Sequence, residues 1–99
     1  MRKIVLLCVA GMSTSMLVKK MIEAANEENY DCTIEAFPIA DAGIVAKDAD
    51  IALLGPEVRF QLKKVENEIS CPILAIDMAA YGTMDGKKVI EQVKKELGD

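Results

Sequence analysis

Short, almost continuously apolar runs alternate with helical patterns along this chain of 99 residues. Lys3–Cys8 and Asp50–Leu54 are apolar at nearly every position, which is typical of strands covered on both faces. Thr33–Phe37 alternates more and is predicted to be an edge strand. Pro72–Ile76 is the fourth run, and its proline fits the start of a strand or an edge. The sequence therefore predicts four strands separated by helices.

Three longer helices are predicted from apolar residues that recur at three- and four-residue spacing. The first ends near Asn29 and has Ser13 or Thr14 as its cap. The second begins near Glu57, and the third follows Asp85, which caps it. A short, weak helix is expected over residues 41–46. No linker, repeat or low-complexity segment divides the chain, so residues 1–99 are expected to form a single domain.

Strands that alternate with helices favour right-handed crossovers and a parallel sheet. Because the first and third strands are the most apolar, we expect them in the centre, in the order 2-1-3-4. The winding then reverses between these two strands, and ligands of such sheets bind at their carboxyl ends beside that point. Cys8 ends the first strand, and Gly55 and Pro56 follow the third. Tyr81 and Gly82 come after the fourth strand and are candidates for the border of the same site.

Composition excludes several classes of function. The formal net charge is −4 with interspersed charges, so no basic stripe for nucleic acid exists. No apolar run approaches the roughly 20 residues of a membrane span, and the N-terminus lacks a signal-peptide pattern, which predicts a soluble, cytoplasmic chain without membrane insertion. Histidine is absent, which excludes a Cys–His pair and a His-ligated zinc. Three cysteines without CxxC spacing fit a reduced compartment.

The run CVAGMSTS joins the first strand to the first helix and begins with Cys8. The free N–H groups and the positive dipole end of that helix are expected to point back at the sulfur. Such a position lowers a thiol pKa and also forms a cradle for phosphate. Gly11 allows the backbone amides to converge, and no Lys or Arg lies in the loop. Cys8 is the candidate nucleophile, and the candidate phosphate-binding residues are Val9, Ala10, Gly11, Met12, Ser13, Thr14 and Ser15.

Two mechanisms are compatible with a cysteine in such a loop. Cysteine phosphatases use the pattern C-x5-R-S/T, in which the arginine stabilises the transition state. Thr14 stands here at the position of that arginine and Ser15 follows it, so the loop length matches but the cation is missing. No Asp-Pro pair offers a general acid either. A carrier of phosphoryl groups is therefore favoured over a hydrolase, which remains the alternative. A receiver-like module lacks its acceptor aspartate, and a redox role lacks a nearby resolving cysteine.

Three further segments accompany the loop, namely MLVKKM, LLGPEVRFQLKKV and YGTMDGKKVIEQV. Together with CVAGMSTS they resemble enzyme IIB of the phosphoenolpyruvate-dependent sugar phosphotransferase system, lactose/cellobiose (chitobiose) type, over essentially the whole chain. The resemblance implies a flavodoxin-like, three-layer α/β/α fold with a four-stranded parallel sheet. It also implies that Cys8 accepts a phosphoryl group from a phosphohistidine on enzyme IIA. The group then passes to a sugar held by the membrane permease, enzyme IIC.

No metal or cofactor is expected on this chain, because amide donors can neutralise the charge of the phosphoryl group, and the chain is expected to be a monomer. The transported sugar is expected to be a β-linked disaccharide such as cellobiose, chitobiose or lactose, but no residue decides among them.

Simpler interpretations stand beside these functional ones. Cys8 can be read as a small buried hydrophobe, which is the usual role of a free cysteine. Cys32 and Cys71 border strands without a helix start behind them and are interpreted as structural. Met16 is either core or exposed near the site, where a flexible side chain suits a surface that meets two partners. Arg59 either faces solvent or a partner, or approaches the phosphate from outside.

Overall fold

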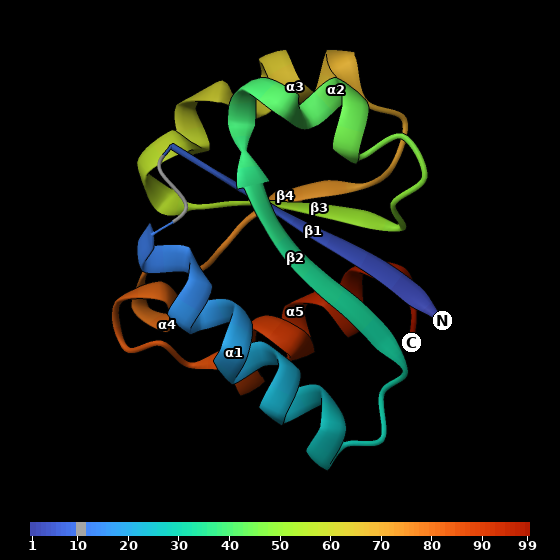
Figure 1. The fold of residues 1–99 in the computed structure, drawn as a ribbon, viewed down its shortest axis with the longest axis vertical. Coiled ribbons are helices and arrows are strands. Elements are labelled where there is room, and N and C mark those ends of the chain that lie inside the picture. The colour runs from blue at the N-terminus through green and yellow to red at the C-terminus, as the bar shows by residue number, and fades with distance from the viewer. Residues whose placement is uncertain (10–11) are drawn as a thin grey trace.

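Four strands form one parallel sheet in the computed structural model, which describes residues 1–9 and 12–99 but not the side chains of residues 12–14. The sheet order is β2-β1-β3-β4 (Figure 1). The strands are β1 (Arg2–Cys8), β2 (Cys32–Pro38), β3 (Ile51–Leu54) and β4 (Ile73–Ala75). This confirms the order predicted from the apolar runs, with β1 and β3 central and β2 at an edge.

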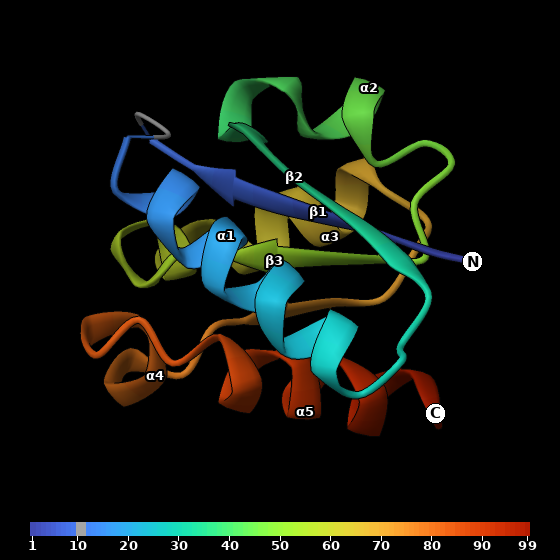
Figure 2. The same ribbon diagram turned by 60° about the horizontal axis from the view of Figure 1, so that its bottom comes forward.

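Helices cover both faces of the sheet and make a three-layer α/β/α sandwich. Figure 2 shows α1 and α5 on one face and α2 and α3 on the other. The helical elements are α1 (Met12–Glu27), η1 (Ile39–Asp41), α2 (Ala42–Val45), η2 (Pro56–Gln61), α3 (Leu62–Glu68), α4 (Met78–Gly82) and α5 (Gly86–Leu97), where η marks a 3-10 helix. The predicted fold class, α/β with a flavodoxin-like arrangement, is thereby confirmed.

Two hydrophobic cores explain why β1 is apolar at successive positions. Ile4 and Leu6 pack into the core beneath α1 and α5, whereas Val5 and Leu7 pack into the core beneath α2 and α3. All four side chains are at most 1% exposed. Side chains alternate between the two faces of a strand, so a strand covered on both faces must be apolar throughout. This burial fixes which side chains of β1 face each core. It therefore also fixes where Cys8, the last residue of β1, lies relative to the neighbouring strands.

The starts of three helices differ in how well the sequence predicted them. Asp85 caps α5 as expected, and its Oδ1 accepts a hydrogen bond from the Lys88 N–H at 3.1 Å. The expected cap of α1 was wrong, because the helix already begins at Met12 and residues 13 and 14 lie inside its first turn. The helix after β3 begins as the 3-10 turn η2 with Pro56 at its first position, and it becomes α-helical at Leu62.

The short helix α4 was not predicted. Asp77 precedes it and caps it, because the carboxylate oxygen Oδ2 accepts a hydrogen bond from the Ala80 N–H at 3.0 Å. Ala80 is buried, and Tyr81 packs against the same core as α1 and α5. With five residues, α4 is too short for a helical period to show in the sequence.

A close approach between α1 and α5 depends on Gly86. A Cβ atom at this position would lie 2.3 Å from the Lys20 carbonyl carbon and 2.5 Å from the Met21 nitrogen. Both atoms are backbone, so they cannot move aside by a change of rotamer. The start of α5 therefore contacts α1 where only glycine fits.

Charged residues tie the amino end of the sheet to the last turn of the chain. The guanidinium of Arg2 donates to both carboxylate oxygens of Asp99 at 2.9 Å, and the Tyr30 hydroxyl donates to Oδ2 at 2.5 Å. These hydrogen bonds from Arg2 and Tyr30 lower the pKa of Asp99 to about 2. Burial, followed by the hydrogen bond to Asp99, raises the pKa of Tyr30 to about 12. The amino end of β1 is thus fixed from outside the sheet as well as by its cores.

Candidate functional site

Cys8 is the last residue of β1 and lies at the point where the winding of the sheet reverses. Its backbone is paired with Pro38 of β2 on one side. On the other side β1 is paired with β3, and the Gly55 N–H that follows β3 donates to the Leu7 carbonyl at 3.0 Å. The polypeptide leaves β1 toward α1 and leaves β3 toward η2. Ligands of open parallel sheets bind at this kind of position, so the topology agrees with the site predicted from sequence.

The thiol of Cys8 is buried. The residue is 1% exposed, and its Sγ donates a weak hydrogen bond to the Phe37 carbonyl oxygen at 3.9 Å. The sequence predicted an ionised sulfur that faces the start of the helix. The 1% exposure fits the simpler reading of Cys8 as a buried residue, and its role as nucleophile stays a prediction.

The backbone after Cys8 leads directly to a helix start. Val9 is 63% exposed and forms a bend. Ala10 and Gly11, both predicted to bind phosphate, lie outside the described residues, as do the side chains of residues 12–14. Since α1 begins at Met12, its first N–H groups have no partner within the helix. These amides and the positive end of the helix dipole follow the candidate nucleophile by only a few residues, which is the arrangement that binds phosphate.

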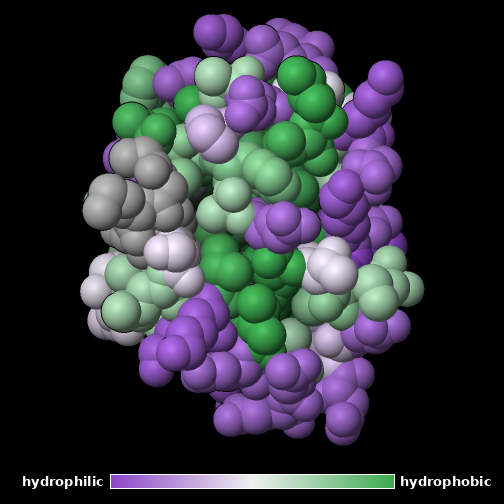
Figure 3. All heavy atoms as spheres, viewed as in Figure 1, coloured by the Kyte–Doolittle hydropathy of each residue, from purple (hydrophilic) through white to green (hydrophobic). Residues whose placement is uncertain are grey.

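Ser15 is the last of the predicted phosphate-binding residues and lies on α1 with an exposed side chain. It lines a hollow of about 360 Å³ with Val18 of the same helix and residues 34–38 of β2. Figure 3 shows apolar residues gathered in this region between α1 and β2. Phe37, whose carbonyl accepts from Cys8, is also in its wall. The contact of Cys8 with β2 was not predicted, because the two residues are 29 positions apart.

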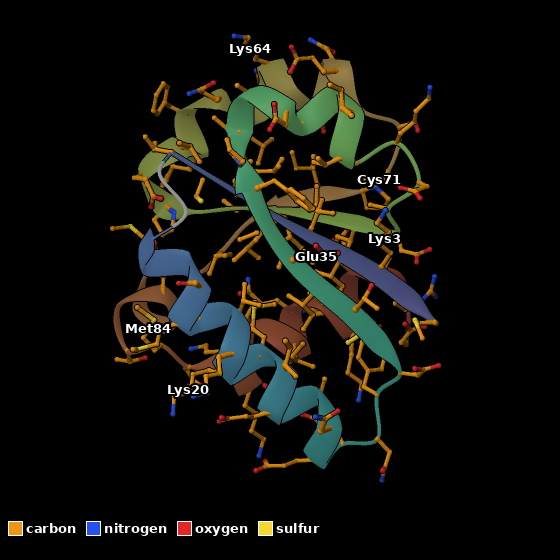
Figure 4. All side chains as sticks on the ribbon, in the orientation of Figure 1. Lys3, Lys20, Glu35, Lys64, Cys71 and Met84 are labelled. Atoms are coloured by element: carbon orange, nitrogen blue, oxygen red, sulfur yellow. The ribbon has the colours of Figure 1, made fainter. Side chains whose placement is uncertain are left out.

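Cys32 and Cys71 are far from this site. Cys32 begins β2, and Cys71, labelled in Figure 4, precedes β4, so both lie at the amino ends of strands. Burial raises the pKa of both thiols, with a smaller contribution from Asp31 at Cys32. A raised pKa leaves less thiolate at neutral pH and makes a poorer nucleophile. Both cysteines agree with the structural role that the sequence suggested.

Exposed apolar side chains gather at the same end of the molecule as Cys8. Met16 on α1 is 60% exposed, Phe60 on η2 is 79% exposed, and Met78 on α4 is 62% exposed. Figures 1 and 2 both show the start of α1, the 56–61 segment and α4 at the end of the sheet where β1 terminates. Large exposed apolar residues that gather at one end of a molecule are typical of a surface that meets another protein. We call Val9, Met16, Phe60 and Met78 the apolar rim.

Arg59 lies within this rim and has an unusual partner. Its Nη1 donates to the thioether sulfur of Met78 at 3.3 Å, across 19 positions of sequence. In the part of the chain that the structure describes, no carboxylate lies within 4.0 Å of this guanidinium. Arg59 and Met78 also line a hollow of about 580 Å³, whose other walls come from Leu62, Ala75, Ile76, Asp77 and Gln92. Sequence left the role of Arg59 open, and Met78 was not singled out.

The described residues contain neither a cluster of metal ligands nor a membrane-spanning helix. Among residues 1–9 and 12–99, no three Cys, Asp or Glu side chains come together as metal ligands. The same residues form no helix that combines the length and the apolar character needed to cross a bilayer.

The fold is a small α/β domain with a parallel sheet. A buried cysteine lies where the winding of that sheet reverses, just before the start of a helix, so the chain belongs to the class of α/β domains with a cysteine in the loop after the first strand. The family model for the "PTS system, Lactose/Cellobiose specific IIB subunit" matches residues 3–92 of the chain. The chain therefore belongs to the lactose/cellobiose-specific IIB family of the sugar phosphotransferase system.

Relatives with known names agree with this assignment. The oligo-β-mannoside-specific EIIB component of Bacillus subtilis is 41% identical over 95 residues, which cover 93% of this chain and 92% of that protein. The galactose-specific EIIB component of Lactococcus lactis subsp. cremoris is 42% identical, and 88% of each chain is covered. The cellobiose-specific EIIB component of Lactococcus lactis subsp. lactis is 41% identical with the same coverage.

Solved structures of the family share the fold. The cellobiose-specific IIB component of Borrelia burgdorferi is 39% identical and superimposes with a TM-score of 0.74, covering 91% of this chain and 85% of that one. The lactose-specific IIB domain of Streptococcus pneumoniae has a TM-score of 0.77 at 20% identity, with 95% of each chain covered, and supports the fold alone. The matches lie with IIB components, so the alternative of a cysteine phosphatase is not favoured.

Proposed function

We propose that this chain carries phosphoryl groups for sugar uptake, with Cys8 as the residue that is phosphorylated. The observation that carries the proposal is the position of Cys8 at the end of β1, immediately before the helix α1, in a chain that matches IIB components over its length. The donor is a phosphohistidine of enzyme IIA, and the acceptor is a sugar held by the membrane permease IIC. The reaction takes place in the cytoplasm.

The first step transfers the phosphoryl group to sulfur. The thiol proton leaves, the sulfur attacks phosphorus in line with the departing imidazole nitrogen, the S–P bond forms and the P–N bond breaks. The imidazole leaves as a neutral ring once it has taken up a proton. On deprotonation Sγ loses its weak hydrogen bond to the Phe37 carbonyl. The free amides at the start of α1 attract both the thiolate and the incoming phosphoryl oxygens.

The second step reverses the role of the sulfur. A sugar hydroxyl attacks phosphorus, its proton passes to a base of the permease, the S–P bond breaks and the thiolate is restored. Amide dipoles hold the phosphoryl group without activating water, and the loop sequence lacks the arginine that cysteine phosphatases use. Transfer to the sugar is therefore favoured over hydrolysis. Two of the relatives are named for β-linked sugars, oligo-β-mannosides and cellobiose, and one for the monosaccharide galactose; the first two support a β-linked disaccharide as the proposed class of sugar.

The test is phosphorylation with purified components. Phosphoenolpyruvate, the general phosphotransferase proteins and an enzyme IIA of the lactose/cellobiose class should add the mass of one phosphoryl group to the chain. Mass spectrometry of the intact protein and of its peptides should locate the group on Cys8, and Cys8→Ser should not acquire it under the same conditions. A phosphoryl group that persists in Cys8→Ser would overturn the assignment of this residue. Steady release of inorganic phosphate by the wild type would instead support the hydrolase.

A further inference from the structure

The described residues place two arginines in opposite environments, and the sequence contains no others. Arg2 donates to the carboxylate of Asp99 and also lies 3.5 Å from Asp50. Arg59 donates to the Met78 sulfur at 3.3 Å, and no carboxylate among the described residues lies within 4.0 Å of its guanidinium. A thioether is a weak acceptor, so most of the donors of this guanidinium remain free for a ligand. Arg2 therefore stabilises the fold, whereas Arg59 is available at the surface.

Neither of two acidic residues close to Arg59 in the fold, Asp77 and Glu57, is paired with it. Asp77 accepts the Ala80 N–H at 3.0 Å and lies 3.9 Å from Lys88 Nζ. Glu57 folds back over Gly55, where a Cβ atom would lie 2.9 Å from its Oε1. Neither acid is within 4.0 Å of Arg59. The guanidinium is thus not neutralised by its own neighbours.

The surroundings of Arg59 have the composition of a binding hot spot. Phe60 and Met78 are largely exposed beside it, and the hollow of about 580 Å³ opens between Arg59 and Met78. Arginine, aromatic residues and methionine are enriched at the centres of protein interfaces. The Met78 sulfur accepts one hydrogen bond from the guanidinium and places it beside the exposed apolar side chains. Any protein that reaches Cys8 covers this end of the molecule.

We propose that Arg59 is the docking anchor for enzyme IIA. On the surface of enzyme IIA, a carboxylate surrounded by apolar residues binds the guanidinium, and the apolar residues pack against Phe60 and Met78. This inference rests on the proposed function. The donor brings a phosphoryl group with close to two negative charges to a chain of net charge −4, and a local cation offsets that repulsion. In the second step the incoming acceptor is an uncharged sugar hydroxyl. Charge complementarity therefore indicates that Arg59 binds the phosphoryl donor, enzyme IIA, rather than the permease.

Binding of the unphosphorylated donor tests the anchor without chemistry. In a Cys8→Ser background, calorimetry compares Arg59→Gln and Arg59→Lys with Lys64→Gln, which removes the same charge from the outer side of α3 (Figure 4). The dissociation constant should rise about tenfold or more in Arg59→Gln, because a charge-assisted hydrogen bond is lost. Arg59→Lys should fall in between, since it keeps the charge without the bidentate fork. Far-UV circular dichroism confirms that each variant is folded.

The rates of the two transfer steps then distinguish an effect on enzyme IIA from an effect on the permease IIC. With Cys8 intact, Arg59→Gln should raise the KM for phosphorylated enzyme IIA about tenfold and leave the maximal rate unchanged. The phosphorylated variant should pass its group to sugar through IIC-containing membrane vesicles at the wild-type rate. Binding and KM equal to those of Lys64→Gln overturn the anchor, as does a defect confined to the sugar step or to the maximal rate. If the wild type binds enzyme IIA through Arg59 but is never phosphorylated, the proposed function fails and the docking inference stands.

Discussion

The three cysteines of this chain have the same side chain but different surroundings, and these surroundings determine what each thiol can do. Cys8 ends a central strand next to a helix start, whereas Cys32 and Cys71 are half-buried at the amino ends of β2 and β4. Burial raises the pKa of the latter two, which keeps them protonated at neutral pH. Position in the fold therefore separates one candidate nucleophile from two structural thiols.

Removal of both structural thiols tests this separation. The double variant Cys32→Ser, Cys71→Ser should accept one phosphoryl group per chain at the wild-type rate, because neither sulfur lies near the start of α1. Intact mass and the rate of phosphorylation measure the outcome, with Cys8→Ser as the negative control. A double variant that stays folded but takes up no phosphoryl group would show that one of these thiols belongs to the reaction.

Between elements, α5 and α1 approach closely at Gly86. Gly86→Ala would place a methyl group 2.3 Å from the Lys20 carbonyl carbon, so the two helices must separate. We expect the free energy of unfolding to fall by about 1–3 kcal/mol, the usual cost of overpacking. Urea denaturation measures the change. Gly82→Ala is the matched control, since nothing lies within 4 Å of its added Cβ, and equal losses in both variants would contradict the steric explanation.

Elements differ in how far sequence could predict them. The strands β1 and β3 were predictable because burial on both faces leaves an unbroken apolar run, and the sheet order followed from their central places. The helix α4 was not, because five residues are too few to show a period.

The features of the candidate site also differ in how far the sequence could predict them. The end of β1 at Cys8 is a local property of the chain. The contacts of Cys8 with Phe37 and of Arg59 with Met78 join segments that are 29 and 19 positions apart, and only the packed fold brings them together.

Across the whole molecule, the ionic contacts at the amino end of the sheet make stability depend on pH. The pKa of Asp99 is lowered from its ordinary value of 3.8 to about 2, first by the hydrogen bond from Arg2 and then by that from Tyr30. The folded state therefore binds this proton less readily than the unfolded state. The stabilisation is fully present above about pH 4 and disappears as the pH falls toward 2.

Asp99→Asn should reduce stability at pH 7 and have a much smaller effect near pH 2, where about half of the folded wild-type protein has a protonated Asp99 carboxyl. Urea unfolding of both proteins between pH 2 and 7 measures this convergence. Asp41→Asn removes an exposed carboxylate that forms no ion pair among the described residues, and its effect should be smaller at pH 7. A difference between wild type and Asp99→Asn that persists unchanged to pH 2 would contradict the assigned role of the carboxylate.

Both ends of the chain emerge together, near the start of β1 and beyond α5, on the side opposite the apolar rim (Figure 1). A fluorescent label, an affinity handle or a second polypeptide fused at either end would consequently project away from Cys8. The protein can thus be immobilised on a sensor through either terminus, or tethered to another component, with the apolar rim still exposed to solvent.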